Sequence, residues 1–533
     1  PGCETAGADH ISLYGYVPLL RPSITAGDTH ASSPRNPEKN TACSGAFRTL
    51  FCDQDFIMIP LLQSVRSHAM FRTKPIRDLV GQSQGEHGLE KVLRPYELVL
   101  LGIGAVVGTG IFVITGVAAA DYAGPAIVLS FVISGLICIL AALCYAEFSA
   151  MVPVAGSAYT YCYASLGEIW AWIIGWDLVL EYAVSISAVS IGWSAYVVNL
   201  LNDFGISLPP ALINPPGVAG GLCNLPAVLI ILAITAILIV GMKESARLNT
   251  LIVIVNVTVI LLFLLLGSSH IDAVNWHPFM PFGWNGVFAG AAIVFFAYIG
   301  FDAVLTAAEE IENPQKNLPA GIIASVVIVM ILYVAVAAVL TGMVPYSDFH
   351  QTGAPVAFAL DRIGITWGAA LVSVGALCGI TSVILASLYG QTRIFFAMAR
   401  DGLLPRFFSE IHTTFHTPAK VTLLVGLVTA TLAAFLPLDV IAELVNIGTL
   451  AAFIIVAFGI LMLRKVQPDA ERPFRCPLMP WIPLLCIVSC AYLILMLPTV
   501  TQLRFVIWMA VGLCLYFMFG QKNSTNNGSS HGS

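Results

Sequence analysis

Two apolar segments of this 533-residue chain are interrupted by residues whose backbone could bind a small charged ligand. The first, residues 98–116 (LVLLGIGAVVGTGIFVITG), contains five glycines, and the second, residues 289–308 (AGAAIVFFAYIGFDAVLTAA), contains Gly300 and Asp302 near its middle. An unpaired backbone group costs roughly several kcal/mol in hydrocarbon, so a broken membrane helix must be buried in protein or line a cavity. Paired breaks at matching positions in the two halves of a membrane chain indicate the substrate site of a transporter.

The first break has the features of a carboxylate site. Gly108 and Gly110 allow the backbone to unwind and a ligand to approach it closely. A half-helix that begins there presents the free amides of Thr109, Gly110 and Ile111, which carry about half a positive charge and suit an anion.

The second break has the features of a site for an ammonium group. Unwinding between Phe296 and Gly300 would free backbone carbonyls, which accept hydrogen bonds from a positively charged amine. The two breaks together would fit a zwitterion without a charged side chain. For one segment alone, glycines that only permit tight helix packing are an equally good explanation, but two breaks in matching positions favour a binding site.

Carboxyl groups inside the apolar segments are further candidates for chemistry. Glu181 lies in the middle of the third segment, where an ionisable group is by default a functional hypothesis. It could titrate during transport, sense a cationic side chain, or be a structural hydrogen-bonded carboxyl. Asp302 lies just beyond the second break and could hold the broken backbone or couple to Glu181. Glu147 and Glu443 lie nearer segment ends, which favours packing or gating.

The composition is that of a membrane protein. Hydrophobic residues make up 58% of the chain, charged residues only 10%, and the mean hydropathy is +0.87, whereas soluble proteins carry about 25% charged residues. The sequence has no basic stripe, nucleic-acid motif or metal-spaced histidine cluster, so we expect no nucleic-acid partner, metal, cofactor or enzymatic activity. The twelve cysteines include no C-x-x-C pair and are best interpreted as small buried apolar residues.

Twelve segments of about 20 apolar residues are long enough to cross a bilayer, which predicts an all-α integral membrane protein with twelve transmembrane helices. The segments lie near residues 94–119, 125–151, 168–200, 225–242, 249–268, 284–309, 319–343, 367–399, 419–436, 440–463, 480–499 and 502–520. With the N-terminus inside, 18 Lys and Arg residues fall on the inner side, against only Arg362 and Arg504 outside. The positive-inside rule therefore puts both termini in the cytoplasm.

The broken segments are the first and the sixth, and an odd number of spans per half inverts the second half in the membrane. We expect a first repeat over residues 94–268, an inverted second repeat over 284–463, and spans eleven and twelve over 480–520. Residues 70–93 would form a basic cytoplasmic N-terminal stretch, and residues 521–533 a disordered polar tail. Residues 1–69 lack periodicity and precede Met70, and we expect them to be disordered or to reflect a mis-set start.

Seven motifs, in order along the chain, resemble one superfamily. They are GAVVGTGIF (104–112), PVAGSAYTY (153–161), GWDLVLEY (175–182), GMKESARLN (241–249), FFAYIGFDAV (295–304), EEIENPQKNLPAGI (309–322) and GQTRIFFAMARDGLLP (390–405). Over about residues 70–520 the chain is similar to the amino acid–polyamine–organocation superfamily. Within it, the chain most resembles the cationic amino acid transporters and their bacterial relatives.

The resemblance implies two inverted five-helix repeats plus two extra helices, with helices 1 and 6 unwound. It implies that the substrate carboxylate lies on the amides of Thr109 and Gly110. The carbonyls that would meet the amino group are those of Val106, Phe296 and Ile299. Phe296 or a neighbouring residue would be an aromatic gate.

Two further positions bear on coupling and specificity. Asn256 lies in the fifth span, where many proton-coupled bacterial relatives carry a lysine. Because Asn cannot titrate, the resemblance argues against proton coupling through that span. Ser387, in LASLYGQTR of the eighth span, resembles the cationic members, since a bulkier residue would shorten the side-chain pocket. An ordinary small residue at a helix contact is an equal alternative for Ser387.

The sequence therefore predicts an amino acid transporter of a bacterial inner (plasma) membrane that works by alternating access in the lipid bilayer. The protein would carry L-amino acids and would prefer the cationic ones, namely arginine, lysine and ornithine. A proton-coupled carrier of small neutral amino acids such as alanine, with Glu181 as the titrating group, is the first alternative. An amino acid-sensing membrane receptor is an alternative of another class, although the short cytoplasmic loops leave little room for a signalling region. Monomeric and homo-oligomeric forms are both compatible with the sequence.

Overall fold

The structure is a computed structural model that describes residues 72–74, 94–154, 157–240, 246–412 and 417–521. Within these ranges every regular element is a helix, apart from an isolated bridge between Pro216 and Gly221. The prediction of an all-helical protein is thus confirmed. The predictions for residues 1–69, for most of residues 70–93 and for the tail after residue 521 fall outside the described residues. In the basic stretch, Lys74 is described, and its Nζ lies 2.6 Å from Oδ1 of Asp401.

The helical elements follow one another with short connections. In chain order they are α4 (Pro95–Val106), η2 (Gly110–Ile114), α5 (Thr115–Ala118), η3 (Ala119–Ala123), η4 (Gly124–Ala126), α6 (Ile127–Met151), α7 (Ser157–Ser165), α8 (Glu168–Asp203), α9 (Pro210–Ile213), α10 (Leu225–Val240), α11 (Ala246–Ser268), η5 (Ala273–Trp276), α12 (Gly283–Val294), η6 (Phe295–Tyr298), η7 (Phe301–Glu310), α13 (Pro314–Met343), η8 (Tyr346–Gln351), α14 (Pro355–Arg362), α15 (Thr366–Arg400), η9 (Arg406–Ser409), α16 (Ala419–Phe435), α17 (Leu438–Val466), α18 (Trp481–Met496), α19 (Thr499–Leu515) and η10 (Tyr516–Gly520).

Seven helices of the described residues are long and apolar enough to cross a membrane. They cover Gly110–Met151, Glu168–Asp203, Thr250–Ser268, Pro314–Met343, Thr366–Arg400, Leu438–Val466 and Thr499–Gly520. Shorter apolar helices accompany them at Pro95–Val106, Leu225–Val240, Gly283–Tyr298, Ala419–Phe435 and Trp481–Met496.

Prolines set several of these helix starts. Pro95, Pro314 and Pro355 occupy the first turns of α4, α13 and α14, where a missing N–H leaves no hydrogen bond unmade. Pro437 and Pro498 stand directly before α17 and α19. The start of each of these helices is therefore marked by a proline, which can begin a helix but disrupts its interior.

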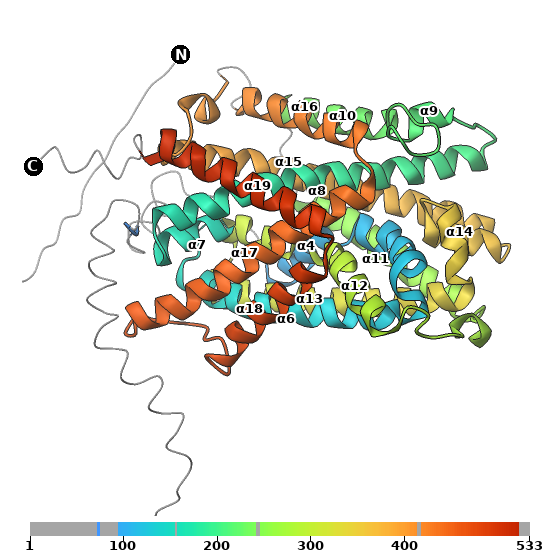
Figure 1. The fold of residues 1–533 in the computed structure, drawn as a ribbon, viewed down its shortest axis with the longest axis horizontal. Coiled ribbons are helices and arrows are strands. Elements are labelled where there is room, and N and C mark those ends of the chain that lie inside the picture. Colours follow the sequence, from blue (N-terminus) through green and yellow to red (C-terminus); the bar gives the residue numbers. More distant parts are fainter. Residues whose placement is uncertain (1–71, 75–93, 155–156, 241–245, 413–416, 522–533) are drawn as a thin grey trace, which may run out of the picture. The chain divides into compact units, whose positions relative to one another are not determined.

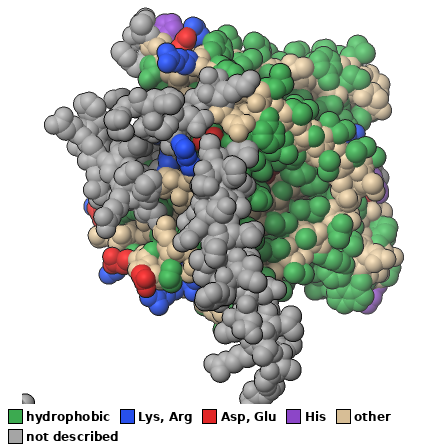
Figure 2. Space-filling model, turned by 60° about the vertical axis from the view of Figure 1, so that its left-hand side comes forward, with side chains coloured by type: hydrophobic (Ala, Val, Ile, Leu, Met, Phe, Trp, Pro, Cys, Tyr) green, Lys and Arg blue, Asp and Glu red, His purple; other side chains and the backbone are tan. Residues whose placement is uncertain are grey.

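Apolar side chains cover much of the outer surface, and Figure 2 shows a broad hydrophobic face. Leu265 of α11 and Leu495 of α18 remain 71% and 68% exposed, as expected for side chains that face lipid. Burial differs strongly between helices: 67% of the most apolar window of α17 is buried, against 17% for residues 499–520. α17 is therefore a central helix, and the functional groups discussed below pack against it.

The two ends of the helical unit carry different short helices. Figure 1 shows α7 at one end, and α9 and α14 at the other. α7 connects α6 to α8, and α14 lies between α13 and α15. The connection from α6 to α8 and the connection from α13 to α15 thus lie at opposite ends of the unit.

Glu147, near the C-terminal end of α6, joins three elements at the α7 end. Its side chain is fully buried, and Arg464 of α17 donates from Nε to Oε1 at 2.8 Å and from Nη2 to Oε2 at 2.5 Å. The amide of Cys476 donates to Oε2 at 2.7 Å, and Nε of Arg472 lies 3.3 Å from Oε1. A buried carboxylate with this many partners is stable, whereas loss of one partner costs about 3–5 kcal/mol. Of the two roles expected for Glu147, this geometry favours packing.

A reciprocal tryptophan pair joins α19 to α8. Trp176 and Trp508 stack with ring centroids 4.5 Å apart and planes inclined by 14°. Nε1 of Trp176 donates to the carbonyl of Trp508 at 2.9 Å, and Nε1 of Trp508 donates to the carbonyl of Trp176 at 3.2 Å. Both indole N–H groups are therefore satisfied, which allows these large rings to be placed between two apolar helices.

Candidate functional site

The first break is a short interruption between α4 and η2. α4 ends at Val106, Val107 has an extended backbone (φ −79°, ψ 96°), and the chain continues as a π-helix from Gly110. Within the described part of the chain, the amides of Thr109, Gly110 and Ile111 have no hydrogen-bond acceptor. The first turn of a helix leaves such amides free to bind an anion, which is the arrangement that the carboxylate prediction requires.

Side chains from two neighbouring helices hold the carbonyls at the first break. Asn256 of α11 donates from Nδ2 to the carbonyl of Val107 at 3.0 Å. Tyr333 of α13 donates from its hydroxyl to the carbonyl of Val106 at 3.0 Å. Asn256 therefore acts on the broken backbone, and a neutral amide replaces the backbone hydrogen bond that the helix loses there.

The second break is longer. α12 ends at Val294 and continues as a 3-10 turn to Tyr298; Ile299 is extended (φ −68°, ψ 139°) and Gly300 is left-handed (φ 112°). The chain then continues from Phe301 as a ten-residue 3-10 helix, η7. Runs of 3-10 helix beyond 3–4 residues are uncommon and often mark a hinge or a strained segment.

The two breaks touch each other backbone to backbone. A Cβ built on Gly110 would lie 2.3 Å from the Cα of Ala297, and a Cβ on Gly300 would lie 2.6 Å from the carbonyl oxygen of Ala105. Both close approaches exclude any residue larger than glycine. At Gly300 the positive φ is a second, independent reason, because other residues rarely adopt that backbone conformation.

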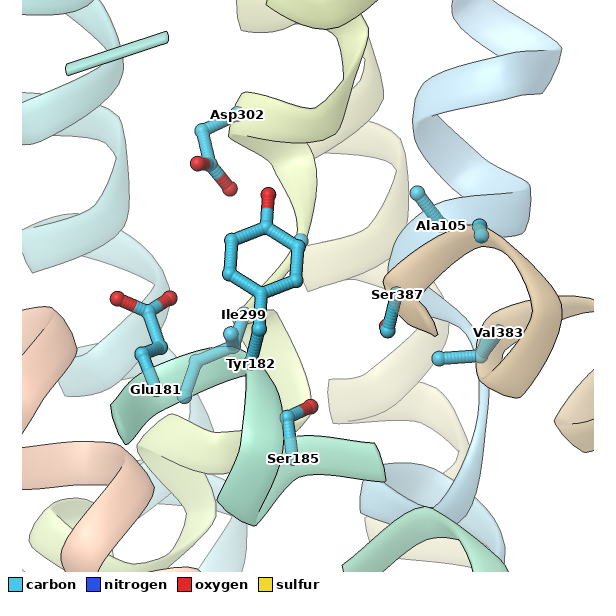
Figure 3. Close-up of a pocket in the computed structure, with 10 residues that line it drawn as sticks. Ala105, Glu181, Tyr182, Ser185, Ile299, Asp302, Val383 and Ser387 are labelled. Atoms are coloured by element: carbon cyan, nitrogen blue, oxygen red, sulfur yellow. The ribbon is translucent and has the colours of Figure 1, made fainter. Parts of the chain in front are cut away.

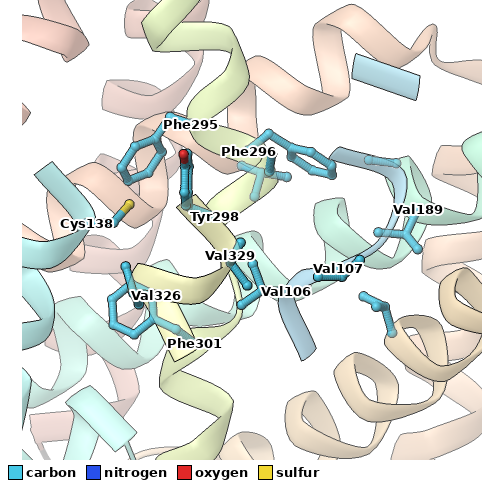
Figure 4. Packing of buried hydrophobic residues seen from close by; sticks show 14 of the residues in the cluster. Val106, Val107, Cys138, Val189, Phe295, Phe296, Tyr298, Phe301, Val326 and Val329 are labelled. Atoms are coloured by element: carbon cyan, nitrogen blue, oxygen red, sulfur yellow. The ribbon is translucent and has the colours of Figure 1, made fainter. Parts of the chain in front are cut away.

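An apolar cluster surrounds the crossing. Figure 4 shows Val106 and Val107 of the first break in the same cluster as Phe295, Phe296 and Tyr298 of the second. None of these five side chains is more than 5% exposed. These side chains shield the first break and residues 295–298 from water in this conformation, whereas Ile299 and Gly300 are partly exposed and line the pocket described next.

A pocket lies beside the crossing and is open on one side (Figure 3). Its internal volume is about 30 Å³, which is room for roughly one or two water molecules, so the pocket is constricted in the described conformation. Its lining comes from α4, α8, the second break, η7 and α15: Ala105, Glu181, Tyr182, Ser185, Ile299, Gly300, Asp302, Val383, Ala386 and Ser387.

The predicted site residues divide into two groups. The pocket is lined by Glu181, Ile299, Asp302 and Ser387. Around the breaks, buried and outside the pocket lining, lie Val106, Gly108, Thr109, Gly110, Ile111, Asn256 and Phe296. The two groups are contiguous, because Ala105 directly precedes the first break and Ile299 belongs to the second.

The pocket is acidic. Glu181 and Asp302 are 4% and 7% exposed, and none of the ten described lining residues is Lys, Arg or His. Figure 3 shows both carboxyl groups on one side of the Tyr182 ring, with the Tyr182 hydroxyl near Asp302. Thr449 of α17 lies within hydrogen-bonding reach of the Glu181 carboxyl. Two ionised carboxyl groups in one low-dielectric site repel each other, so a proton or a cationic group stabilises them.

Sequence reasoning missed five side chains of the pocket, one of which is that of Ala105 at the end of α4. Tyr182 and Ser185 follow Glu181 on α8, and Val383 and Ala386 precede Ser387 on α15. Helical spacing would have found them once the inward face of each helix was known. Because these spans are apolar around much of their circumference, hydrophobic periodicity does not identify that face.

The chain has clear relatives among known proteins. A family model described as "Amino acid permease" matches residues 93–519. The methylthioribose transporter of Bacillus subtilis (strain 168) is 50% identical over 460 residues, which cover 86% of this chain and 99% of that protein. The branched-chain amino acid permease BcaP of the same organism is 49% identical over 462 residues, with the same coverage of 86% and 99%. The vacuolar cationic amino acid transporter 4 of Arabidopsis thaliana is 40% identical over 398 residues, or 73% of this chain and 66% of that protein.

Proposed function

This chain belongs to the amino acid permease family, and from that premise we propose that it carries L-amino acids across a membrane by alternating access. The resemblance to the amino acid–polyamine–organocation superfamily is confirmed, and the relatives are permeases and transporters, not enzymes. The observation that carries the proposal is the crossing of two interrupted helices directly beside an acidic pocket. Interrupted helices of this kind form the substrate sites of secondary transporters.

We propose that the backbone at the breaks binds the carboxylate and ammonium groups that all amino acid substrates share. The substrate carboxylate would bind the free amides of residues 109–111. Its ammonium group would bind the carbonyls of Val106, Phe296 and Ile299. The Val106 carbonyl already accepts from Tyr333, but a carbonyl oxygen has two lone pairs and can accept a second hydrogen bond.

Alternating access is supported by the closeness of the two breaks. The backbones meet at Gly110 and Ala297, which leaves no room for a ligand between them. A substrate that bridges the amides of one break and the carbonyls of the other therefore requires the helices to separate. We infer that the described conformation is closed at the breaks, with Phe296 covering them, and open only toward the pocket.

The acidic lining supports a preference for cationic amino acids, namely arginine, lysine and ornithine. A guanidinium or ammonium group near Glu181 and Asp302 would be attracted by both carboxyl groups, and the described lining holds no Lys, Arg or His that would repel it. Ser387 is a small residue on the α15 side of the pocket, so it would obstruct a long substrate side chain less than a bulkier residue there.

A second candidate function is the transport of neutral amino acids. Ala105, Ile299, Val383 and Ala386 give the same pocket an apolar wall, and a relative of 49% identity is named a branched-chain amino acid permease. In that case a proton would compensate the carboxyl groups, and Glu181 would be the titrating group. Alanine and leucine are then the substrates to test against arginine.

We propose twelve spans arranged as two inverted repeats plus two extra helices. Counting α4 to α5 as the first span and α12 to η7 as the sixth, both breaks lie in the first span of a half. α7 and α14 occupy equivalent places, each between the second and third spans of its half, and they lie at opposite ends of the helical unit (Figure 1). An inverted repeat places equivalent connections on opposite sides of the membrane, so this arrangement supports the proposal.

The charges of the connections support an orientation with both termini in the cytoplasm. Arg406, Lys420, Arg464 and Arg472 belong to connections that the twelve-span topology puts on the α7 side, whereas Arg362 ends α14. The positive-inside rule assigns the α7 side to the cytoplasm. We place the protein in the plasma membrane, as a bacterial inner-membrane carrier.

The deciding experiment is uptake of labelled arginine into proteoliposomes, with alanine and leucine as competitors and with or without an inward proton gradient. Arginine uptake that is indifferent to the gradient supports a cationic facilitator. Transport of alanine or leucine without arginine supports the neutral alternative. Binding of amino acids without uptake of any of them would refute the transport function and favour a receptor.

A further inference from the structure

Asp177 is a buried carboxyl group that the proposed substrate site does not use. It lies in α8, is 1% exposed and does not line the pocket. Within the described residues, neither of its carboxyl oxygens has a hydrogen-bond partner. Most buried side-chain polar atoms have such a partner, so an exception of this kind needs an explanation.

Asp177 lies on the same helix face as the acidic wall of the pocket. It precedes Glu181 by four residues, which is one turn of α8. A Cβ on Gly448 of α17 would lie 2.9 Å from Oδ1 of Asp177 and 3.9 Å from Cβ of Glu181. One glycine of the central helix α17 therefore covers both carboxyl-bearing residues, and the charges of the two carboxyl groups interact.

Among the described residues, the ionisable groups whose charges act on the Glu181 carboxyl are themselves carboxyl groups, namely those of Asp177 and Asp302. On α8 the neighbour of Asp177 is Glu181, and η7 contributes Asp302. α6 contributes Tyr145 and α7 contributes Tyr161, both of which interact with Asp302.

Glu443 and Arg464 of α17 interact with groups other than Asp177. The other charged residues of α17, Asp439 and Lys465, lie in its first and last turns. Glu443 accepts a hydrogen bond from Thr501, and Arg464 is paired with Glu147. Where α17 faces Asp177, it presents Gly448 and, next to it, Thr449. Among the ion pairs of the described residues, none includes Asp177.

A buried carboxylate without a cation or a hydrogen bond is strongly disfavoured, whereas its protonated form is neutral and much less costly to bury. Hard metal cations require a shell of several oxygen ligands. The close approach of Gly448 and the absence of partner oxygens on Asp177 among the described residues fit a proton and not such an ion.

We propose that Asp177 is a proton-binding site of the carrier, which exchanges its proton with Glu181, and so with the pocket, when α8 and α17 move apart. The O–H bond of Asp177 breaks as an O–H bond forms on the Glu181 carboxylate, and water that enters between the helices carries the proton. This inference rests on the proposed transport function. It also provides a route for proton coupling that does not involve Asn256.

The test uses the full-length chain in proteoliposomes and two assays on the same preparation. The first is exchange of labelled for unlabelled amino acid at equal pH, and the second is accumulation driven by a pH step with the outside acidic. The substrate is whichever of arginine, leucine and alanine the unmodified protein exchanges fastest. Exchange reports substrate binding and conformational change, whereas accumulation also requires the proton.

Asp177→Asn retains the size and neutrality of the protonated carboxyl but cannot release a proton. We expect its exchange to stay within about twofold of the unmodified protein and its pH-driven accumulation to fall at least about tenfold. Asp177→Glu should restore accumulation. The matched control is Glu168→Gln, another buried carboxyl of α8, whose oxygens accept hydrogen bonds from Tyr163 and Tyr516. We expect this control to retain both activities.

Undiminished accumulation by Asp177→Asn would overturn the proposal. So would loss of exchange and accumulation together without rescue by Asp177→Glu, because that result indicates a structural role. Exchange without any pH-driven accumulation by the unmodified protein would overturn the proton site but leave the transport function standing. Failure to exchange any amino acid would overturn both.

If Asp177→Asn does not fold, the unmodified protein can decide the question. Hydrophobic carbodiimides react with protonated carboxyl groups in apolar surroundings, and mass spectrometry locates the adduct. Modification of Asp177 at neutral pH during substrate exchange supports the proposal. Modification of Glu181 without modification of Asp177 under the same conditions overturns it.

Discussion

Among the pocket residues, Ser387 is the one at which depth can be changed without altering the contact between the two breaks. Ser387→Met would add a long apolar side chain to the α15 wall, opposite the acidic residues. We expect arginine uptake to fall at least about tenfold and alanine uptake by about threefold or less, since pocket contacts of one or two methylenes change rates on this scale. Labelled uptake in proteoliposomes measures both.

Leu385→Met is the matched control for that substitution. Leu385 is partly buried on the same helix but does not line the pocket. A change from Leu to Met conserves volume and is usually tolerated, so both uptake rates should be retained. If Ser387→Met instead lowered arginine and alanine uptake equally, Ser387 would have no role in side-chain selection.

Asp361 of α14 offers a test of electrostatics outside the spans. Burial, with a smaller contribution from the charge of Asp203, raises the pKa of Asp361 from 3.8 to about 6. A carboxyl group whose pKa is higher in the folded than in the unfolded chain binds its proton more tightly when folded, so its contribution to stability is lost as pH rises through this interval.

Asp361→Asn should therefore raise the unfolding temperature near neutral pH and leave it unchanged at a pH of about 4 or below. Because the side chain is partly exposed, we expect a gain of only about 1 °C. Thermal unfolding of the purified protein at the two pH values measures the difference. A lower unfolding temperature near neutral pH would contradict the assigned pKa direction.

At the residue scale, Glu181 and Asp302 could be predicted because an ionisable group inside an apolar segment is costly and therefore informative. The same rule applies to Asp177, which lies in the same segment and was not singled out from the sequence. Tyr182 differs, because an aromatic residue is common in any span, and only the orientation of α8 directs it into the pocket.

At the scale of elements, the contact between the two broken helices depends on Gly300. Gly300→Ala would place a Cβ 2.6 Å from the carbonyl oxygen of Ala105 and would force a left-handed conformation on alanine. The conformation alone costs about 1–2 kcal/mol, and the collision also moves α4 away from η7. We expect uptake to fall at least about tenfold and thermal stability to decrease.

Gly364→Ala separates conformational strain from the collision. Gly364 also has a positive φ, of 83°, but a Cβ there meets nothing within 4 Å. It should cost the same backbone strain and leave uptake nearly unchanged. Equal loss of uptake in the two variants would show that contact with Ala105 is unimportant. Gly110 is less suitable for such a test, because a side chain there would disturb packing against Ala297 as well as the proposed carboxylate site.

The positions of both breaks could be predicted from clustered glycines in apolar segments, but their forms could not. Residues 110–114 form a π-helix and residues 301–310 form a 3-10 helix. Each of the two broken helices departs from α-helical geometry near its contact with the other. The role of Asn256 as a donor to the Val107 carbonyl depends likewise on the packing of α11 against α4. Such contacts between segments far apart in sequence leave no local pattern.

At the scale of the whole molecule, the proposed inverted repeat predicts which connections face each side of the membrane. A cysteine replacing Val218, between α9 and α10, should react with a membrane-impermeant maleimide on intact cells. A cysteine replacing Asp469, between α17 and α18, should react only after lysis. Both native side chains are exposed, and the unmodified chain gives the background. Labelling of both on intact cells would contradict the proposed topology.

Periodicity, segment length and loop charge were enough to predict a helical membrane protein, because these properties are read one segment at a time. The pocket combines residues from α4, α8, the second break, η7 and α15, and these residues lie between positions 105 and 387 of the chain. Its composition follows from how the helices pack, and only the resemblance to a family placed Ser387 near it beforehand.

The reciprocal pair of Trp176 and Trp508 is an intrinsic spectroscopic probe of the contact between α8 and α19. Two indoles stacked at 4.5 Å in a fixed relative orientation are close enough for their electronic transitions to couple, and we expect a contribution to the circular dichroism spectrum that depends on this stacking. The signal exists only while α19 is attached to α8, because each ring is held by the backbone of the other helix. Separation of the last helix, by detergent or during insertion, would therefore be visible without any label, even while the helical content stayed constant.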